Sequence, residues 1–171
     1  GFPERTSGIV QKFNSSGVFQ LVWGTAGSGN GQFLNGAGGV AVDSAGNVYV
    51  TDLGNHRIEK FTSGGSFIMS WGSSGTGNGQ FSAPEGIAID TTDNIYVADT
   101  GNHRVQKFNT SGTFVTKWGT LGTADGQFDT PWGVSTDGIG DVYVADTNNN
   151  RIQRFSPTGT FISSCGVSGT G

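Results

Sequence analysis

The feature that most constrains this chain is a segment of 13 residues that occurs three times in nearly the same form. It reads YVTDLGNHRIEKF at 49–61, YVADTGNHRVQKF at 96–108 and YVADTNNNRIQRF at 143–155, and a shorter copy, IVQKF, lies at 9–13. The last phenylalanines of the four copies are spaced by 48, 47 and 47 residues. A fixed period of this size indicates that one supersecondary unit is used repeatedly, so the fold follows from the identity of that unit.

Each period contains four short segments with the composition of β-strands. In the second complete period they are 86–90, 95–99, 104–108 and 113–118. The residues between them are rich in Gly, Asn, Asp, Ser and Thr, which favour tight turns. Although 31 of the 171 residues are glycine, the regular aromatic and β-branched segments argue against disorder. Four short strands in every 47 residues predict a blade of a β-propeller, with the least polar strand beside the central axis and the repeated Phe and Trp between blades.

The repeat divides the chain into unequal parts of a single all-β domain. We predict complete blades at 24–71, 72–118 and 119–165, a half-blade holding only the third and fourth strands at 1–23, and the beginning of another repeat at 166–171. Unpaired strand edges tend to pair with another strand. We therefore expect the edges of these three and a half blades to be covered by further blades of the same protein or by other copies of the chain, in a ring or a filament.

The repeated residues also carry a family resemblance. Residues 80–108 read QFSAPEGIAIDTTDNIYVADTGNHRVQKF, and this pattern resembles the NHL repeat nearly position by position. Residues 32–61 and 127–155 match it with small departures, such as Ala37 in place of the proline at Pro84 and Pro131. The resemblance implies a propeller, six-bladed in most relatives, that serves as a binding or scaffolding platform. It also implies two alternatives, because some similar propellers are lyases or hydrolases that hold a metal on the central axis, and others bind RNA through a basic face.

Composition narrows the choice of partners and location. The net charge is −4 with only nine Lys and Arg, which argues against nucleic-acid binding because such binding depends on clustered positive charge. No apolar run approaches the roughly 18 residues that predict a membrane-spanning helix. A surface rich in Gly, Ser, Thr and Asn favours an extracellular or cell-surface location. Asn14 and Asn109 begin Asn-x-Ser sequences and are candidate glycosylation sites.

The single cysteine, Cys165, excludes an intrachain disulfide. It stands in the column of the repeat that Trp23, Trp71 and Trp118 occupy. We therefore predict that Cys165 is a packing residue rather than a reactive thiol.

Each full repeat contains an Asp followed five residues later by an Arg. The pairs are Asp52 with Arg57, Asp99 with Arg104, and Asp146 with Arg151. Each Asp ends a predicted strand and each Arg begins the next, which favours a charge-assisted hydrogen bond that closes the turn. Because a catalytic site on a repeat protein usually interrupts the repeat, we predict no catalytic residues among these pairs.

The repeat also argues against a metal or cofactor site. His56 and His103 occupy equivalent positions, and Asn150 replaces the third member of the set. Zinc needs three or four converging ligands, so we interpret the histidines as turn residues. Asp43, Asp90 and Asp137 lack the spacing of a calcium-binding loop and are better explained as Asx-turns. The glycine-rich loops, such as 75–79, lack the Lys and the following helix of a phosphate-binding loop.

The glycine-rich loops and the Asn-His-Arg turns are predicted to share one face, and loops on a rigid scaffold commonly carry binding sites. The candidate binding residues there are Asn55, His56, Asn102, His103, Asn149, Asn150 and Trp132. Trp132 interrupts its column, so it either stacks on a sugar or a partner or packs against the neighbouring loop. Our first hypothesis is a non-catalytic scaffold for protein interaction or self-assembly. The alternatives are a metal-dependent lyase or hydrolase, and a glycan-binding propeller.

Overall fold

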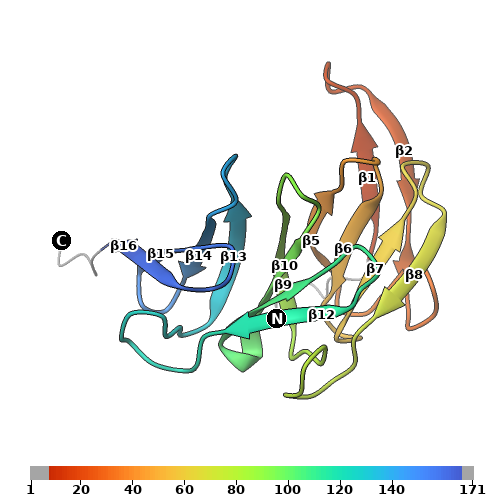
Figure 1. Ribbon diagram of the computed structural model, residues 1–171. Helices are drawn as coiled ribbons and strands as arrows, with labels where there is room; N and C mark the ends of the chain where they lie inside the picture. The colour runs from red at the N-terminus through yellow and green to blue at the C-terminus, as the bar shows by residue number, and fades with distance from the viewer. Residues whose placement is uncertain (1–7, 167–171) are drawn as a thin grey trace, which may run out of the picture.

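The computed structural model describes residues 8–166, which form a row of antiparallel sheets (Figure 1). A hairpin of β1 (Val10–Phe13) and β2 (Phe19–Trp23) comes first. The first blade consists of β5 (Ala37–Val42), β6 (Val48–Asp52), β7 (Arg57–Phe61) and β8 (Phe67–Trp71). The second consists of β9 (Pro84–Ile89), β10 (Ile95–Asp99), β11 (Arg104–Phe108) and β12 (Phe114–Trp118). The third consists of β13 (Pro131–Thr136), β14 (Val142–Asp146), β15 (Arg151–Phe155) and β16 (Phe161–Cys165).

Three smaller elements lie in the connections between these strands. The short strands β3 (Thr25–Ala26) and β4 (Gln32–Phe33) pair in parallel within the connection from the hairpin to the first blade. The 3-10 turn η1 (Thr100–Asn102) links β10 to β11. The predicted beginning of another repeat falls on 166–171, which apart from Gly166 lies outside the described residues, as do residues 1–7 of the predicted half-blade.

The strand order makes each four-stranded sheet a propeller blade. Within a blade, strands that are consecutive in sequence are hydrogen-bonded neighbours. The first strands of adjacent blades lie side by side, β5 against β9 and β9 against β13, as expected for strands beside a central axis. The predicted all-β propeller fold is confirmed.

The strand bounds follow the sequence pattern closely, and the largest difference is at the start of β9. β10 and β11 coincide with the predicted strands at 95–99 and 104–108, whereas β9 begins at Pro84 instead of 86. The extra residues pair because the register of β9 against β10 shifts between Val97 and Asp99, which brings Pro84 opposite Asp99. A β-bulge of this kind leaves no clear signal in a hydrophobic pattern.

The hydrophobic core lies between blades. One cluster joins Tyr49 and Ile58 of the first blade to Phe81 and Phe108 of the second. Each tryptophan of a fourth strand packs on the third strand of the next sheet, with ring centroids 5.9, 5.8 and 5.8 Å apart; the pairs are Trp23–Phe61, Trp71–Phe108 and Trp118–Phe155. These contacts agree with the prediction that the repeated aromatic residues fill the space between blades.

The prediction that Cys165 is a packing residue is wrong, because its side chain is exposed. The tryptophans of this column lie against a glycine in the outer turn of the following sheet. A Cβ atom built on Gly112, for example, would come within 2.8 Å of the Trp71 ring. No sheet follows β16 among residues 8–166, so Cys165 has no such turn to contact.

Between residues 8 and 166, no helix is long and apolar enough to cross a membrane.

Candidate functional site

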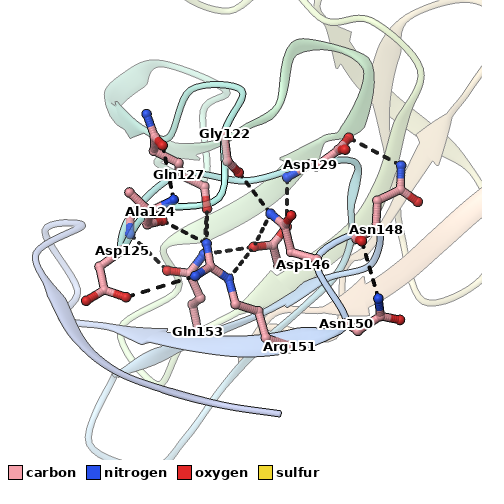
Figure 2. A network of polar contacts seen from close by, with 12 residues as sticks. Gly122, Ala124, Asp125, Gln127, Asp129, Asp146, Asn148, Asn150, Arg151 and Gln153 are labelled. Carbon is pink, nitrogen blue, oxygen red and sulfur yellow. Dashed lines mark hydrogen bonds and ion pairs between the residues drawn. The ribbon is translucent and has the colours of Figure 1, made fainter. Parts of the chain in front are cut away.

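A buried aspartate organises the turn between the second and third strands of every blade, as Figure 2 shows for the third blade. Asp146 Oδ2 accepts hydrogen bonds from Arg151 Nε at 2.7 Å and from Gln153 Nε2 at 3.0 Å. Its Oδ1 accepts one from the backbone N–H of Asp129 at 2.7 Å and another from Asn149 Nδ2 at 3.0 Å. The carboxylate is fully buried and surrounded by donors.

The arginine of each pair connects this turn to the glycine-rich loop. In the second blade, Arg104 Nε lies 2.6 Å from Asp99 Oδ2. Its two outer nitrogens donate to the carbonyls of Thr76 at 2.6 Å and of Gly77 and Gln80 at 2.8 Å. Arg57 of the first blade and Arg151 of the third hold their loops in the same way. The structure therefore places the glycine-rich loops and the Asp–Arg turns on one face and binds them to each other.

The histidines occupy strained turn positions and use one ring nitrogen internally. His56 and His103 have φ values of 54° and 53°, in the left-handed region, and Asn150 has the same conformation at 54°. Asn and His are among the residues that tolerate this region best. Nδ1 of His56 accepts the backbone N–H of Ala83 at 3.0 Å, and Nδ1 of His103 accepts that of Thr130 at 3.1 Å. Each histidine thereby joins its own blade to the loop of the next.

The asparagines predicted to lie on the binding face are also engaged within the protein. Asn55, Asn102 and Asn149 each donate Nδ2 to a glycine carbonyl at 2.9 Å and to the aspartate of their own turn. The side chain of Asn150 makes only a long contact in the described structure, 3.4 Å from its Nδ2 to the Asn148 carbonyl. The loop face is thus a rigid polar network, and its role in binding stays a prediction.

Trp132 differs from the other candidates because its side chain is free. It is 55% exposed and lines a shallow hollow at the beginning of the inner strands, together with Glu85 and glycines of β5, β9 and β13. The glycines allow the inner strands to approach closely, since a Cβ on Gly86 would lie 2.6 Å from the Trp132 carbonyl oxygen. The side chain of Trp132 is thus largely exposed, and its stacking on a sugar or a partner stays a prediction.

The remaining polar residues of the repeat serve the outer turns. Asp90 Oδ1 accepts the backbone N–H groups of Thr92 and Asn94 at 2.9 Å, and its Oδ2 accepts the Tyr96 hydroxyl at 2.9 Å. Burial acts to raise the pKa of Asp90, but the hydrogen bonds from Asn94, Thr92 and Tyr96 outweigh it and the pKa is lowered. Among the described residues, no group of three or more His, Cys, Asp and Glu side chains could hold a metal ion.

The two candidate glycosylation sites lie in equivalent turns. Asn14 and Asn109 are exposed, and each accepts two backbone N–H groups through Oδ1, at 2.9 to 3.0 Å. Nδ2, the atom that a glycan would modify, donates to no neighbour in the described residues.

Sequence analysis missed an apolar hollow beside β1. Val10 and Phe13 of β1, Trp23, and Val40 and Val42 of β5 line it. Its volume is about 390 Å³, which lies in the range of small-ligand sites. Val40 and Val42 are 57% and 58% exposed, and Phe13 is 51% exposed. The alternation of Val40 and Val42 in the inner strand was a visible signal, but the sequence could not show what faces them.

Sequence analysis also missed Glu59, which lies in β7 with a fully buried side chain. Burial first, and then the nearby Asp52 carboxylate, raise the pKa of Glu59 to about 7 against the opposing effects of Arg57 and the Gly31 N–H. The available signal was the repeat itself, because Gln106 and Gln153 hold the same position in the other blades.

Comparison with protein families found three matches to the model described as NHL repeat, at residues 34–61, 81–108 and 128–155. Each match begins just before the inner strand and ends with the third strand. A comparison with curated proteins found no match.

Comparison with solved structures found propellers of low sequence identity. Virginiamycin B lyase from Staphylococcus aureus is 14% identical with a TM-score of 0.69, over 96% of this chain and 50% of that one. A gluconolactonase from Xanthomonas campestris is 14% identical with a TM-score of 0.63, over 94% and 56%. A chain of a nidogen/laminin complex is 23% identical with a TM-score of 0.56, over 77% and 50%. The chain spans about half the length of these structures, and likeness at this identity shows the fold alone.

Proposed function

Because this chain belongs to the NHL-repeat family, we propose that it is a non-catalytic scaffold that binds protein segments, including further blades of its own protein or other copies of itself. The observation that carries this proposal is the apolar hollow beside β1.

The hollow adjoins a strand that has a free edge. β1 is the equivalent of β7, β11 and β15, each of which is paired on both sides. Within residues 8–166, β1 is paired only with β2. An unpaired strand edge exposes a row of backbone N–H and C=O groups that another extended segment can pair with.

The blades themselves show which segment fits. In every blade the place next to the third strand is taken by a strand of sequence Val/Ile-Tyr-Val-x-Asp, namely β6, β10 or β14. These strands are largely buried, with Tyr49 and Tyr96 fully inaccessible. An extended segment with alternating aromatic and β-branched residues would add main-chain hydrogen bonds to β1 and cover Val40 and Val42. This mode of recognition is β-strand addition.

The loop face supports a platform rather than a reaction centre. Its repeated Asp, Arg and Asn side chains bind one another and the loop carbonyls, as described for Asp99 and Arg104. Rigid scaffolds of this kind commonly present binding surfaces. Trp132 and Glu85 at the inner-strand hollow are the second surface that a protein or glycan ligand could use.

The proposal can be tested with a fluorescent peptide that copies residues 93–101, which include β10. We expect the peptide to bind the intact chain in an anisotropy titration, and the substitution Val40→Lys to weaken binding at least about tenfold, since a charge would enter an apolar contact. The matched control is Val115→Lys, because Val115 is 52% exposed on β12, away from the hollow. A scrambled peptide should not bind.

Sedimentation of the chain alone over a range of concentrations tests the self-association part. Association that Val40→Lys weakens and Val115→Lys leaves unchanged would support it. If the chain stays monomeric and binds no peptide, the proposal is wrong. Stoichiometric zinc or calcium in the purified protein, with a melting temperature that falls on its removal, would favour the lyase or hydrolase alternative.

A further inference from the structure

The position of Glu59 in β7 requires a side chain that both accepts and donates hydrogen bonds, as the equivalent residue of the second blade shows. Gln106 Oε1 accepts the N–H of Gly79 at 3.0 Å. Gln106 Nε2 donates to the Gln80 carbonyl at 2.7 Å and to Asp99 Oδ2 at 3.0 Å. Gln153 of the third blade makes the same three contacts with its own loop and aspartate.

Glu59 reproduces the accepting half of this arrangement. Its Oε2 accepts the N–H of Gly31 at 3.0 Å, as the glutamine oxygens do. Its Oε1 stands in the place of the donating nitrogen and has no hydrogen-bond partner. The equivalent nitrogens meet a loop carbonyl and an aspartate oxygen, both of which are acceptors. An ionised Glu59 has no hydrogen to offer them, whereas a protonated carboxyl group has one.

Arg57 does not remove this mismatch. Its Nη2 lies 2.6 Å from Glu59 Oε1, but it donates to the carbonyls of Gly29 at 2.6 Å and Gln32 at 2.9 Å. Its Nε is 2.9 Å from Asp52. The charged groups that face Glu59 in the described structure are therefore Arg57 from its own strand and Asp52 from β6, while the loop contributes the Gly31 N–H. Two buried carboxylates share one cation, and like charges in a buried site favour protonation of one of them.

We propose that Glu59 carries a proton in the folded protein and loses it as the solution becomes alkaline, which makes the connection between the hairpin and the first blade responsive to pH. The proton lies between Glu59 Oε1 and the first-blade equivalents of the glutamine's acceptors, which are the Gln32 carbonyl and the Asp52 carboxylate. On deprotonation, the new charge competes for Arg57, which otherwise holds the carbonyls of Gly29 and Gln32. The pKa of Glu59, raised to about 7 chiefly by burial, agrees with this assignment.

The effect reaches the hairpin through Phe33. This residue follows Gln32 in β4, is 1% exposed, and packs in a cluster with Val10 of β1 and Trp23 of β2. Loosening the loop at Gln32 therefore weakens the packing of Phe33 against β1 and β2. This inference does not depend on what the hollow beside β1 binds.

The direction of the pH dependence of stability follows from the direction in which the pKa of Glu59 is shifted. The pKa of Glu59 is higher in the folded chain than its ordinary value of 4.5, so the folded state binds more protons between the two values. The contribution of Glu59 to stability is then greatest below the ordinary pKa, decreases as the pH rises through about 7, and is level above it.

The direct test is a carbon NMR titration of the Glu59 carboxyl group in the intact chain, compared with Glu59→Gln. We expect a midpoint near 7 for that carboxyl group in the wild-type protein. Glu59→Gln should raise the melting temperature by roughly 5 °C at pH 8 and have little effect at pH 4. The control Glu85→Gln should leave the pH dependence unchanged. Amide hydrogen exchange of residues 27–33 should become faster from pH 6 to pH 8, after correction for intrinsic rates, only when Glu59 is present.

The reciprocal variant is Gln106→Glu, which places a carboxyl group in the same position of the second blade. It should add a second titration near neutral pH and lower the melting temperature more at pH 8 than at pH 5. A Glu59 carboxyl that titrates at its ordinary value overturns the proposal, whatever the stability of the variants. So does a Glu59→Gln protein whose pH dependence equals that of the wild type.

Discussion

In the second and third blades, the aspartate at the turn between the second and third strands is saturated with hydrogen-bond donors, and this decides its role. In the second blade, Asp99 accepts the backbone N–H of Ser82 at 2.8 Å and the side chains of Asn102, Arg104 and Gln106 at 2.6 to 3.0 Å. A carboxylate whose lone pairs are all engaged offers no site to a substrate. The aspartate should instead contribute to the stability of the fold, because removing one partner of a buried ion pair leaves the charge of the other uncompensated.

The substitution Asp99→Asn tests this at the level of one residue. It keeps the shape of the side chain but replaces an acceptor by a donor next to Arg104, so we expect a loss of about 3 kcal/mol in the free energy of unfolding, measured by urea denaturation. Asp125→Asn is the matched control, because Asp125 is 64% exposed and 4.0 Å from Arg151. Its loss should be below about 0.5 kcal/mol. Equal losses for the two variants would mean that the Asp99 network is not what holds the blade.

Acid should act on a second set of aspartates, those of the outer turns. The pKa values of Asp43 and Asp90 are lowered because hydrogen bonds from Asn47, Asn94 and the tyrosine hydroxyls outweigh the effect of burial. A lowered pKa contributes stability that is present above the ordinary value of 3.8 and is lost as the pH falls through the folded value. We expect the melting temperature to decrease below about pH 4, and Asp90→Ala to make that decrease smaller. An unchanged acid dependence in Asp90→Ala would contradict this.

At the scale of strands and turns, the repeat predicted the strands and turns of one blade but not the contacts that its side chains make with other segments. β10, β11 and the outer turns followed from alternation and turn residues, because these are local preferences. The bulge between Val97 and Asp99, the engagement of His56 by the next loop and the exposure of Cys165 all depend on contacts between segments far apart in the chain. The difference between Glu59 and Gln106 was visible in the sequence, yet its meaning required the position of Asp52 beside it.

The outer turns show how one blade is fixed on the next. Gly17 and Gly112 occupy the same turn position, with φ values of 75° and 74°, but only Gly112 lies beneath a tryptophan. Gly17→Ala should lower the free energy of unfolding by about 1 kcal/mol, because alanine is strained in a left-handed backbone conformation. Gly112→Ala should cost about 2–4 kcal/mol, because the new methyl group would also displace Trp71. Thermal unfolding of both variants measures the difference. Equal losses of stability would mean that the packing of Trp71 on this turn does not stabilise the contact between the blades.

For the whole molecule, the blades form a linear series in which each sheet depends on its neighbours. The second blade has a sheet on both sides, and every residue of β10 and β11 is buried. The third blade and the hairpin have fewer neighbours in the described structure, and β2 and β16 are mostly exposed. In such arrays, stability is close to a sum of repeat and interface contributions, so it should vary along the chain.

Hydrogen exchange can map this variation, because protection reports the free energy of local opening. In the isolated chain, amides of β10 and β11 should exchange slowest, and those of β2 and β16 at least about tenfold faster. Addition of a segment that pairs with β1 should slow exchange in β1 and β2 and leave β16 unchanged, since β16 belongs to the opposite end of the series (Figure 1). Uniform protection from β1 to β16 would instead mean that the blades open as one cooperative unit. In that case pairing at β1 would stabilise the third blade as much as the hairpin.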